Sequence, residues 1–438
     1  MSPTTEGLIV LIVTLLILLS GIPVAFGLGA ISIVFLLFFQ GFASMHVVAE
    51  TFLSGLDEFT LVAIPMFVMM GAAIGSSPAG KDLYEALDRW LYRLPGGLAI
   101  SNIGACAIFA ALTGSSPACC AAIGKMGIPE MRRRGYPDGI ATGSICAGGT
   151  LGILIPPSVT FILYGIATET SIGRLFIAGV LPGIMLTGLF ILWTLFAIWR
   201  SGFRSHAADF RYSWKEKFAG IPKITPFIAI VVGVMYVLYG GVATPSEAAG
   251  VGAGLCLVLA LVIYRLWQPH QVWAILRDTM RESVMILTII AASVLFGYML
   301  TSLYLTQTLA QGIADLHANK WLLMFLINVF LLVCGFFIPP AAIILMTSPI
   351  LLPIITAAGF DPVWFGVIVT INMEIGLIHP PVGLNIYIVN AIAPDVPIVK
   401  VMWGTLPYVV CMMLAIVILC FFPQIATWLP DHLMGAGK

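Results

Sequence analysis

Glycine, proline and hydroxyl residues interrupt four long apolar stretches of this chain. A helix that breaks inside such a stretch leaves backbone carbonyls without partners at the end of its first half, and N–H groups without partners at the start of its second half. Carbonyl and hydroxyl oxygens suit a small hard cation, whereas converging N–H groups suit a carboxylate. We therefore predict that the four interruptions bind a cation and a small acid.

The predicted cation ligands lie at these interruptions, where glycine allows close backbone approach. In the first half of the chain they are Thr113, Gly114, Ser115, Ser116, Gly149, Thr150 and Gly152. In the second half they are Gly335, Ile338, Gly376 and His379. Taken singly, the hydroxyls of Ser115, Ser116 and Thr150 could equally bond to the preceding helical turn. Their shared position beside the sequence GSSP and the following break favours ion binding.

The predicted substrate contacts surround the same breaks. They are Ser116, Pro117, Pro156, Pro157, Ser158, Pro339, Pro340, Pro381 and Asn385. Glu374 lies deep in an apolar run, and we expect it to carry a proton, to ligate an ion or to pair with a cation. A structural carboxyl bonded to a neighbouring helix is the alternative. His379 could titrate near neutrality or could simply pack.

The composition places these residues in a membrane protein. The chain is 60% hydrophobic and 9% charged, against about 25% charged in an ordinary soluble domain. Such a chain cannot cover a globule with polar surface, so membrane lipid is an expected partner. The net charge is zero, which makes nucleic acid an unexpected one. The apolar runs and their breaks predict an all-α integral membrane protein with about ten transmembrane helices.

Proline landmarks recur along the chain at a nearly constant distance. The pairs are Pro23 and Pro245, Pro129 and Pro353, Pro156–Pro157 and Pro380–Pro381, and Pro182 and Pro407, all 222 to 225 residues apart. This spacing predicts two halves of one architecture, residues 1–222 and 223–438. Each half is expected to hold scaffold helices, a hairpin and a broken helix. The respective ranges are 7–57, 97–131 and 137–168 in the first half, and 224–267, 320–354 and 362–393 in the second.

The positions of the basic residues predict that the second half is inverted. Basic residues concentrate on the cytoplasmic side of membrane proteins. If the clusters Lys81–Arg93, Arg132–Arg134, Arg200–Lys223 and Arg265–Arg281 and the single Lys400 face inward, sixteen of the twenty Lys and Arg residues lie inside. The first half then starts outside and the second half starts inside. Both termini are expected on the outer, periplasmic side.

Two segments are too short to be pairs of ordinary spans. Gly97–Thr113 is followed by GSSP and then by Ala118–Met131, whose 14 residues make about 21 Å of helix, against a hydrocarbon core of about 30 Å. Leu322–Phe337 and Ala341–Pro353 repeat this pattern. We therefore predict two re-entrant hairpins, each followed by a helix broken at Pro-Pro. Broken backbone at membrane depth is tolerated inside protein or beside a watery cavity. Glycine and proline that only kink ordinary helices are the alternative.

Six motifs together resemble the large membrane subunit of tripartite ATP-independent periplasmic (TRAP) transporters. They are LPGGLA (94–99), GSSPACCAAIG (114–124), IPEMRRRGYP (128–137), IPPSVTFILYGIATETSIGRLFIAGVLPG (155–183), TPSEAAGVGA (244–253) and EIGLIHPPVGLN (374–385). The resemblance implies a sodium-driven elevator-type importer of organic acids, such as C4-dicarboxylates, sialic acids or sugar acids, in the bacterial inner membrane. It implies Na+ as the coupling ion and no organic cofactor. It also implies two partners: a periplasmic substrate-binding protein, and a small four-helix membrane subunit expected as a separate chain.

The resemblance places sodium at GSSP with residues 149–152, and at the second hairpin tip with residues 376–380. The second tip departs from the family pattern, because Pro339 stands where an acidic residue is common. Backbone oxygens are therefore the expected ligands there. A symporter of the same architecture that needs no binding protein is the closest alternative, and a passive channel is a further one. An enzyme is not expected, because GxSxG and HExxH are missing from the sequence.

Overall fold

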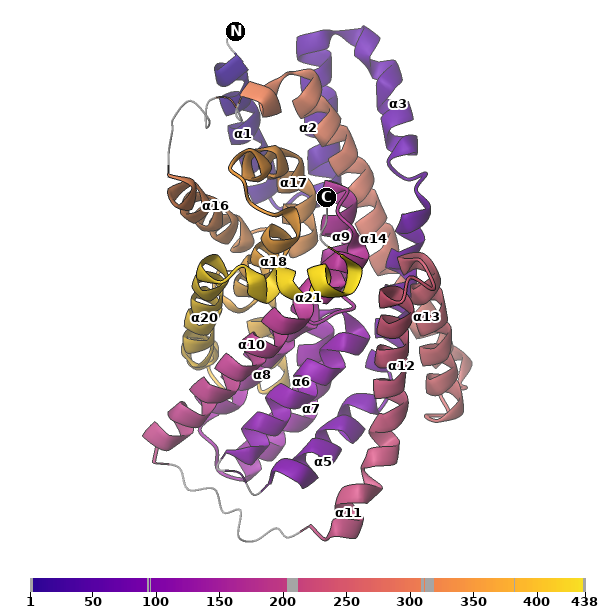
Figure 1. Ribbon diagram of the computed structural model, residues 1–438, viewed down its shortest axis with the longest axis vertical. Coiled ribbons are helices and arrows are strands. Elements are labelled where there is room, and N and C mark those ends of the chain that lie inside the picture. The colour runs from indigo at the N-terminus through magenta and orange to yellow at the C-terminus, as the bar shows by residue number, and fades with distance from the viewer. Residues whose placement is uncertain are drawn as a thin grey trace.

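The computed structural model describes residues 3–92, 94, 96–202, 212–308, 311, 319–381 and 383–435. Arg93, residues 203–211 and Lys438 therefore lie outside the described residues. All regular elements in the described ranges are helices, as predicted (Figure 1). Residues from one end of the chain to the other contribute to a single large buried apolar core.

The first half contains twelve described helical elements. They are α1 (Pro3–Leu19), α2 (Val24–Gln40), η1 (Phe42–Ser44), α3 (Met45–Ser54), η2 (Phe59–Val62), α4 (Ala63–Gly75), α5 (Ala79–Leu91), α6 (Gly97–Thr113), α7 (Ser116–Arg133), α8 (Asp138–Leu154), α9 (Val159–Thr168) and α10 (Ile172–Arg200). The second half follows with α11 (Trp214–Ala219), α12 (Ile221–Tyr239), α13 (Pro245–Val262), α14 (Pro269–Ser302), α16 (Lys320–Gly335), α17 (Pro340–Ala357), α18 (Pro362–Ile378), α19 (Leu384–Ile392), α20 (Ile398–Phe421) and α21 (Gln424–Met434).

Several of these helices have the length and composition of membrane spans. Among the described residues, α10, α13, α14, α17 and α20 are long and apolar enough to cross. The number rises to seven if two bent pairs each count as one span: Phe42–Ser54 with Phe59–Gly75, bent by 53°, and α8 with α9, bent by 41°. Six shorter apolar helices accompany them. The number of about ten crossings stays a prediction.

The hairpins form, but the argument from their length was wrong. α7 and α17 are each 18 residues long, or about 27 Å, and α17 alone is long enough to span. Both helices extend past the predicted ends because proline near a helix start fits its first turn and because interior prolines are tolerated at Pro129, Pro349 and Pro353. What identifies the hairpins is packing: α6 contacts α7, and α16 contacts α17.

The two halves repeat each other with exchanged partners. The second part of the first broken helix, α9, packs on the second hairpin arm α17, while the second part of the second broken helix, α19, packs on the first hairpin arm α7. In Figure 1, α6 and α7 occupy the lower half of the molecule, and α16 and α17 the upper half. This reciprocal packing is what an inverted repeat produces.

The long parts of the broken helices form the centre of the fold. Every residue of α8 from Ala141 to Leu154 is buried, and so is every residue of α18 from Val363 to Ile378. α8 contacts α6, α7, α10 and α20, and α18 contacts α16, α17 and α20. A helix that is buried all round needs no polar face, so glycine and small side chains set how closely its neighbours approach.

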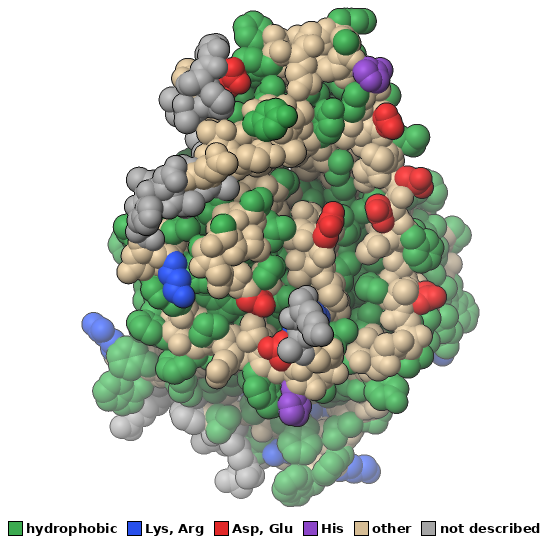
Figure 2. Space-filling model, turned by 45° about the horizontal axis from the view of Figure 1, so that its top comes forward, with side chains coloured by type: hydrophobic (Ala, Val, Ile, Leu, Met, Phe, Trp, Pro, Cys, Tyr) green, Lys and Arg blue, Asp and Glu red, His purple; other side chains and the backbone are tan. Residues whose placement is uncertain are grey.

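The remaining helices lie around this centre. α4 packs on α13 and α14, α14 also packs on α2 and α3, and α12 packs mainly on α13 and α5. Apolar side chains cover much of the visible surface, which suits contact with lipid (Figure 2). Acidic side chains gather on this face, and Lys and Arg are sparse on its upper part. The orientation of the chain in the membrane stays a prediction.

Candidate functional site

The tip of the first hairpin lies against the first broken helix. Gly114 ends α6 in the left-handed conformation with φ 57°, which glycine adopts at little cost. A Cβ on Gly114 would lie 3.1 Å from the carbonyl oxygen of Pro157. Ser115 is extended and precedes the first turn of α7. The structure therefore brings the predicted GSSP ligands directly to the Pro156–Pro157 break.

Glycines of α8 allow the backbone of this tip to approach. A Cβ on Gly152 would lie 2.8 Å from the carbonyl oxygen of Ser115, and a Cβ on Gly149 would lie 3.2 Å from that of Ser116. Both carbonyls thus face α8 at distances that leave no room for a side chain. Thr150 Oγ1 donates to the carbonyl of Ala147 at 2.6 Å, which is the bond to the preceding helical turn that the sequence left open as the alternative for this hydroxyl.

The second tip repeats this arrangement. A Cβ on Gly376 would lie 2.7 Å from the carbonyl carbon of Gly335, whose oxygen it would overlap. Beyond this contact α16 ends, Ile338 donates its N–H to Cys334 at 3.0 Å, and α17 begins at Pro340. Two hairpin tips are therefore each joined to a broken helix by a backbone contact that only glycine permits.

His379 lies at the second break with its side chain turned aside. Its ring stacks on Phe336 with centroids 4.5 Å apart, and its Nδ1 lies 2.5 Å from the carbonyl oxygen of Pro380. The ring is therefore occupied by packing and by a local contact. Nδ1 is therefore directed at the backbone of Pro380, and we take the backbone oxygen of His379 as its candidate cation ligand.

Asn385 connects the second broken helix to the first tip. Its side chain is fully buried, and Nδ2 donates to Ser116 Oγ at 2.8 Å and to the carbonyl of Cys146 at 3.3 Å. Its Oδ1 is buried without a hydrogen-bond partner among the described residues. The sequence places Asn385 among the substrate contacts. The structure adds that its amide holds the GSSP hydroxyl in place.

Glu374 is buried beside the same tip. None of its surface is exposed, and neither carboxyl oxygen has a hydrogen-bond partner in the described part of the chain. It lies close enough to Cys119 of α7 and to the Ile153 amide of α8 for electrostatic interaction. The Ile153 amide belongs to a neighbouring helix, so the alternative of a structural carboxyl held by that helix stands beside the functional one.

Two close contacts beside the tips involve residues that the sequence analysis did not identify. A Cβ on Gly71 of α4 would lie 2.6 Å from the carbonyl oxygen of Thr113, so α4 touches the first tip. Asn372 Nδ2 donates to Asn328 Oδ1 at 2.5 Å between α18 and α16. The small residues around Gly71 and the polar side chain of Asn328 in an apolar helix were the available signals.

An ion-pair network joins the two halves at the inner end predicted from charge. Arg132 donates to both carboxyl oxygens of Asp395, at 3.0 and 2.5 Å, and to Asp138 at 3.1 Å. Lys400 donates to Asp138 at 2.8 Å. The hydrogen bonds from Arg132 hold the pKa of Asp395 below its usual range. The network fixes the base of the first hairpin to the end of the second broken helix.

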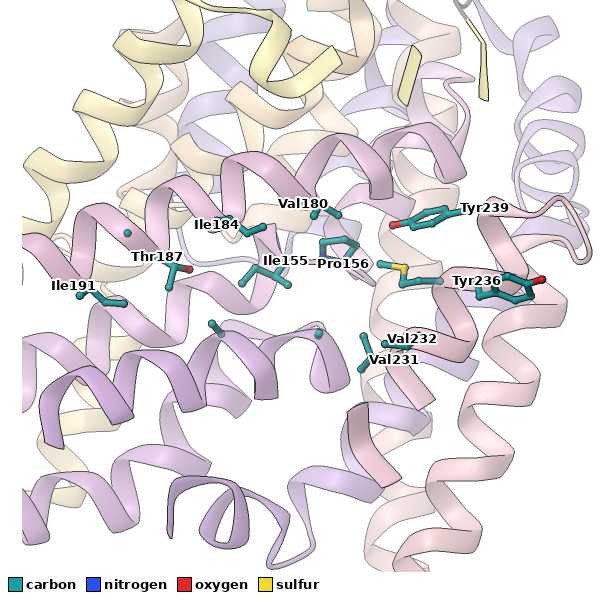
Figure 3. Close-up of a pocket in the computed structure, with 14 residues that line it drawn as sticks. Ile155, Pro156, Val180, Ile184, Thr187, Ile191, Val231, Val232, Tyr236 and Tyr239 are labelled. Carbon is teal, nitrogen blue, oxygen red and sulfur yellow. The ribbon is translucent and has the colours of Figure 1, made fainter. Parts of the chain in front are cut away.

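A cavity of about 760 Å³ lies next to the first break, but its lining is apolar. It is bounded by α6, by Ile155 and Pro156, by α10 and by α12 (Figure 3). A carboxylate would find no charged partner among its lining residues. Within the described ranges, no three His, Cys, Asp or Glu residues gather as a metal cluster. A cation bound at the hairpin tips would therefore depend on backbone, hydroxyl and amide oxygens.

Comparison with known proteins gives a consistent picture. Residues 9–425 match the family described as the tripartite ATP-independent periplasmic transporter, DctM component. The C4-dicarboxylate TRAP transporter large permease DctM of Pseudomonas aeruginosa is 37% identical over 377 residues, covering 86% of this chain and 87% of that protein. The sialic acid large permease SiaM of Vibrio cholerae is 31% identical, covering 96% and 98%.

Two further comparisons concern chain organisation and fold. The isethionate permease DctMQ of Oleidesulfovibrio alaskensis is 33% identical over 94% of this chain, which covers 64% of that longer protein. The crystal structure of the Alcanivorax borkumensis YdaH transporter superposes with a TM-score of 0.63, covering 97% of this chain and 98% of that one at 16% identity. At this identity the likeness concerns the fold alone.

Proposed function

The chain belongs to the DctM family, the large membrane subunits of tripartite ATP-independent periplasmic transporters, and on this premise we propose that it imports a small organic acid together with Na+. The acid is a C4-dicarboxylate, a sialic or sugar acid, or a similar carboxylate. Relatives that carry C4-dicarboxylate and sialic acid in their names support this range. The proposed role is that of a carrier subunit and not of an enzyme.

The observation that carries the sodium proposal is the glycine-dependent contact at each tip. The Ser115 carbonyl faces Gly152, and the Gly335 carbonyl faces Gly376. Each contact places carbonyl oxygens of a hairpin beside the unpaired carbonyls at the end of a broken helix. Partial negative charge from two helix ends converges there. The proposed sodium ligands are those predicted from the sequence, with His379 contributing its backbone oxygen.

The proposed acid site lies between the starts of the half-helices. α7, α9, α17 and α19 all begin at the breaks, where their first N–H groups lack partners within the helix. These amides and the partial positive charge of the helix starts favour a carboxylate. The residues that would line this site are Ser116, Pro117, Pro156, Pro157, Ser158, Pro339, Pro340, Pro381 and Asn385. Glu374 is proposed to couple ion and substrate, because it is buried within electrostatic reach of Cys119 on α7, the helix whose Ser116 binds Asn385.

The proposed movement is an elevator in which both hairpins and both broken helices travel as one body. The bonds of Arg132 to Asp395 and of Asn385 to Ser116 support this, since each joins the two halves within that body. The helices around α4, α13 and α14 would form the stationary part. A hairpin tip that opened independently would have to break the glycine contacts.

The proposed partners are a periplasmic substrate-binding protein and a small four-helix membrane subunit. The DctMQ relative is longer than this chain, which supports a close association with the small membrane subunit. The proposed location is the bacterial inner membrane with both termini in the periplasm. A sodium/carboxylate symporter of the same architecture without a binding protein remains the second candidate function.

Sodium binding by the purified full chain tests the proposal without the partners. A ligand that binds only the folded protein stabilises it, by about 2.7 kcal/mol at a hundredfold excess over Kd. We expect a higher melting temperature in NaCl than in KCl or choline chloride of equal ionic strength. Equal melting temperatures in the three salts would contradict sodium coupling.

Uptake into proteoliposomes then separates the two candidate functions. We expect uptake of radiolabelled succinate or N-acetylneuraminate only with an inward sodium gradient, the small subunit and a cognate binding protein. Sodium-driven uptake by the chain alone would replace the tripartite proposal by the second candidate. Rapid uptake independent of sodium would favour a channel.

A further inference from the structure

We propose that the buried ion pair between Asp88 of α5 and Arg134 at the end of α7 is a latch that holds the first hairpin in the position described here. The proposal rests on the elevator movement proposed above, and it adds that α5 stays with α11 and α12 while the hairpin moves past it. α5 contacts α6 and α7 on one side and α11 and α12 on the other (Figure 1). A movement of the hairpin relative to α12 therefore has to change the contacts on one side of α5.

An aromatic cluster ties the end of α5 to α11. The buried Lys217 of α11 has its ammonium 5.8 Å from the ring centroid of Trp90, 5.2 Å from that of Tyr92 and 5.1 Å from that of Trp214. The attraction between an ammonium and a ring face is stronger when the ammonium is withdrawn from water. Trp90 also packs edge-on against Phe218, with centroids 5.6 Å apart. Because α11 leads into α12, this cluster fixes α5 to the start of the second half.

Two further contacts fix the rest of α5 to the same part of the protein. Near the start of α5, Tyr264, which follows α13, donates its hydroxyl to Asp82 at 3.0 Å. In the middle of α5, a Cβ on Gly220 would lie 3.2 Å from the Cβ of Ala86, so the start of α12 lies directly against the helix. The contacts of α5 with the second half therefore extend along its whole length, and we assign α5 to the stationary part.

Apolar contacts dominate the opposite side of α5, which faces the first hairpin. A Cβ on Gly80 would lie 3.3 Å from the Cβ of Ala122 and 3.5 Å from Cδ1 of Ile123 on α7, and a Cβ on Gly104 of α6 would lie 3.7 Å from Cδ1 of Leu87. Apolar groups can exchange neighbours along such a face without leaving a buried polar group unpaired. This side of α5 is therefore suited to a hairpin that slides along it.

The ion pair opposes this sliding. Arg134 donates to both carboxyl oxygens of Asp88, at 3.0 and 3.4 Å, and the two side chains are only 19% and 6% exposed. Tyr212 donates its hydroxyl to the same carboxyl at 3.2 Å, which holds Asp88 on the side of the second half. Separating a buried pair is costly because each charge loses its partner away from bulk water. The pair therefore stabilises the described position of the hairpin over a displaced one.

Tyr84 is placed to replace Arg134 once the latch opens. Its hydroxyl is buried without a hydrogen-bond partner in the described part of the chain, and it lies within electrostatic reach of Asp88, one helical turn further along α5. A hydroxyl that donates to a carboxylate lowers the cost of keeping that carboxylate buried. Arg134 keeps its bond to Glu130 of its own helix, at 2.8 Å, and Glu130 travels with it. Each charge then has a partner after separation, so the latch can open and close.

Double electron–electron resonance on the full chain in nanodiscs tests the latch without sodium or substrate. Genetically encoded nitroxides at Lys125 of α7 and Val251 of α13, both exposed, report the position of the hairpin. We expect Asp88→Asn to raise the ratio of displaced to described positions by about tenfold or more, because Arg134 loses its charged partner. Arg134→Gln should act in the same direction, and it provides the test if the first variant does not fold.

The matched control is Glu85→Gln, because the ion-pair partners of Glu85 are Lys81 and Arg89 of α5 itself. It should leave the distances unchanged. Tyr84→Phe should not raise the displaced fraction, because it removes only the donor that replaces Arg134. Parental distances in folded Asp88→Asn and Arg134→Gln variants would overturn the latch even if the melting experiment shows sodium binding. A displaced position released by these variants would support the latch even if sodium binding fails.

Two engineered disulfides then decide which side of α5 moves. Gly80→Cys with Ala122→Cys joins α5 to α7, and Ala86→Cys with Gly220→Cys joins α5 to the start of α12. The Cβ atoms would lie 3.3 and 3.2 Å apart, close to the roughly 3.5–4.5 Å of a disulfide. Copper phenanthroline forms each bond by oxidising the two thiols, and dithiothreitol reverses it. With Asp88→Asn, the first disulfide should return the hairpin to the described position, whereas the second should leave the displaced fraction unchanged. The reverse pattern would overturn the assignment of α5 to the stationary part.

Discussion

Replacing Gly152 by alanine tests the proposed sodium site with the smallest possible change. The added Cβ would lie 2.8 Å from the Ser115 oxygen, 2.9 Å from its carbonyl carbon and 3.0 Å from the Ser116 nitrogen, whereas ordinary contact begins at 3.4 Å. All three atoms are backbone, so a rotamer change cannot relieve the overlap. The first hairpin tip must move away from α8 by about 0.6 Å to reach ordinary contact.

The expected energies follow from this displacement. Overpacking costs about 1–3 kcal/mol, and alanine in place of glycine inside a helix returns about 1 kcal/mol. The folded state should therefore survive with a loss of about 2 kcal/mol or less. The Ser115 carbonyl, in contrast, moves out of its place beside the end of α8. We expect the half-saturating sodium concentration to rise at least tenfold, about 1.4 kcal/mol of binding free energy.

Sodium titration of the melting temperature measures both effects in one experiment. The intercept without sodium reports the change in fold stability, and the half-saturation point reports the site. Gly254→Ala, made in open space on α13, is the control and should leave the sodium dependence unchanged. A Gly152→Ala variant that folds and keeps the parent's half-saturating sodium concentration would refute the site at this break.

Three further substitutions address the other parts of the site. Gly376→Ala should abolish one component of the sodium titration, because the new Cβ overlaps the Gly335 carbonyl; a superimposable titration would remove the second tip as a site. The double variant Ser115→Ala with Ser116→Ala should raise the sodium requirement for uptake severalfold while backbone ligands persist, and unchanged sodium dependence would place the site elsewhere. Glu374→Gln should keep the fold, because the carboxyl has no described hydrogen-bond partner to lose, and should change the ratio of sodium ions to substrate; parental coupling would return this residue to a packing role.

Much of the helical order could be predicted because proline and glycine mark helix ends by local chemistry. α6 has the predicted bounds of Gly97–Thr113. The ends of α7 and α17 were missed by one to four residues. Apolar periodicity says little about whether a helix continues past a proline, since neighbouring helices supply that stability.

Some residues of the candidate site could also be predicted from the sequence, and others could not. Sequence reasoning found the glycines of both tips, because a glycine beside a break in an apolar run needs a special reason. It could not find that Gly71 touches Thr113 or that Asn372 bonds to Asn328. These partners come from different helices, and nothing in either local sequence specifies the other.

The sequence by itself determined the class of this protein, its duplicated plan and the places where its helices break. Composition, proline spacing and basic clusters depend only on local residue chemistry and on the cost of charge in lipid, so they can be read along the chain. Only the tertiary structure decided that α9 packs on α17 and α7 on α19, that Asn385 binds Ser116, and that Glu374 lies near Cys119 of α7 and the Ile153 amide of α8. Such contacts join residues more than 170 positions apart, and their geometry arises from the close packing of all the helices at once.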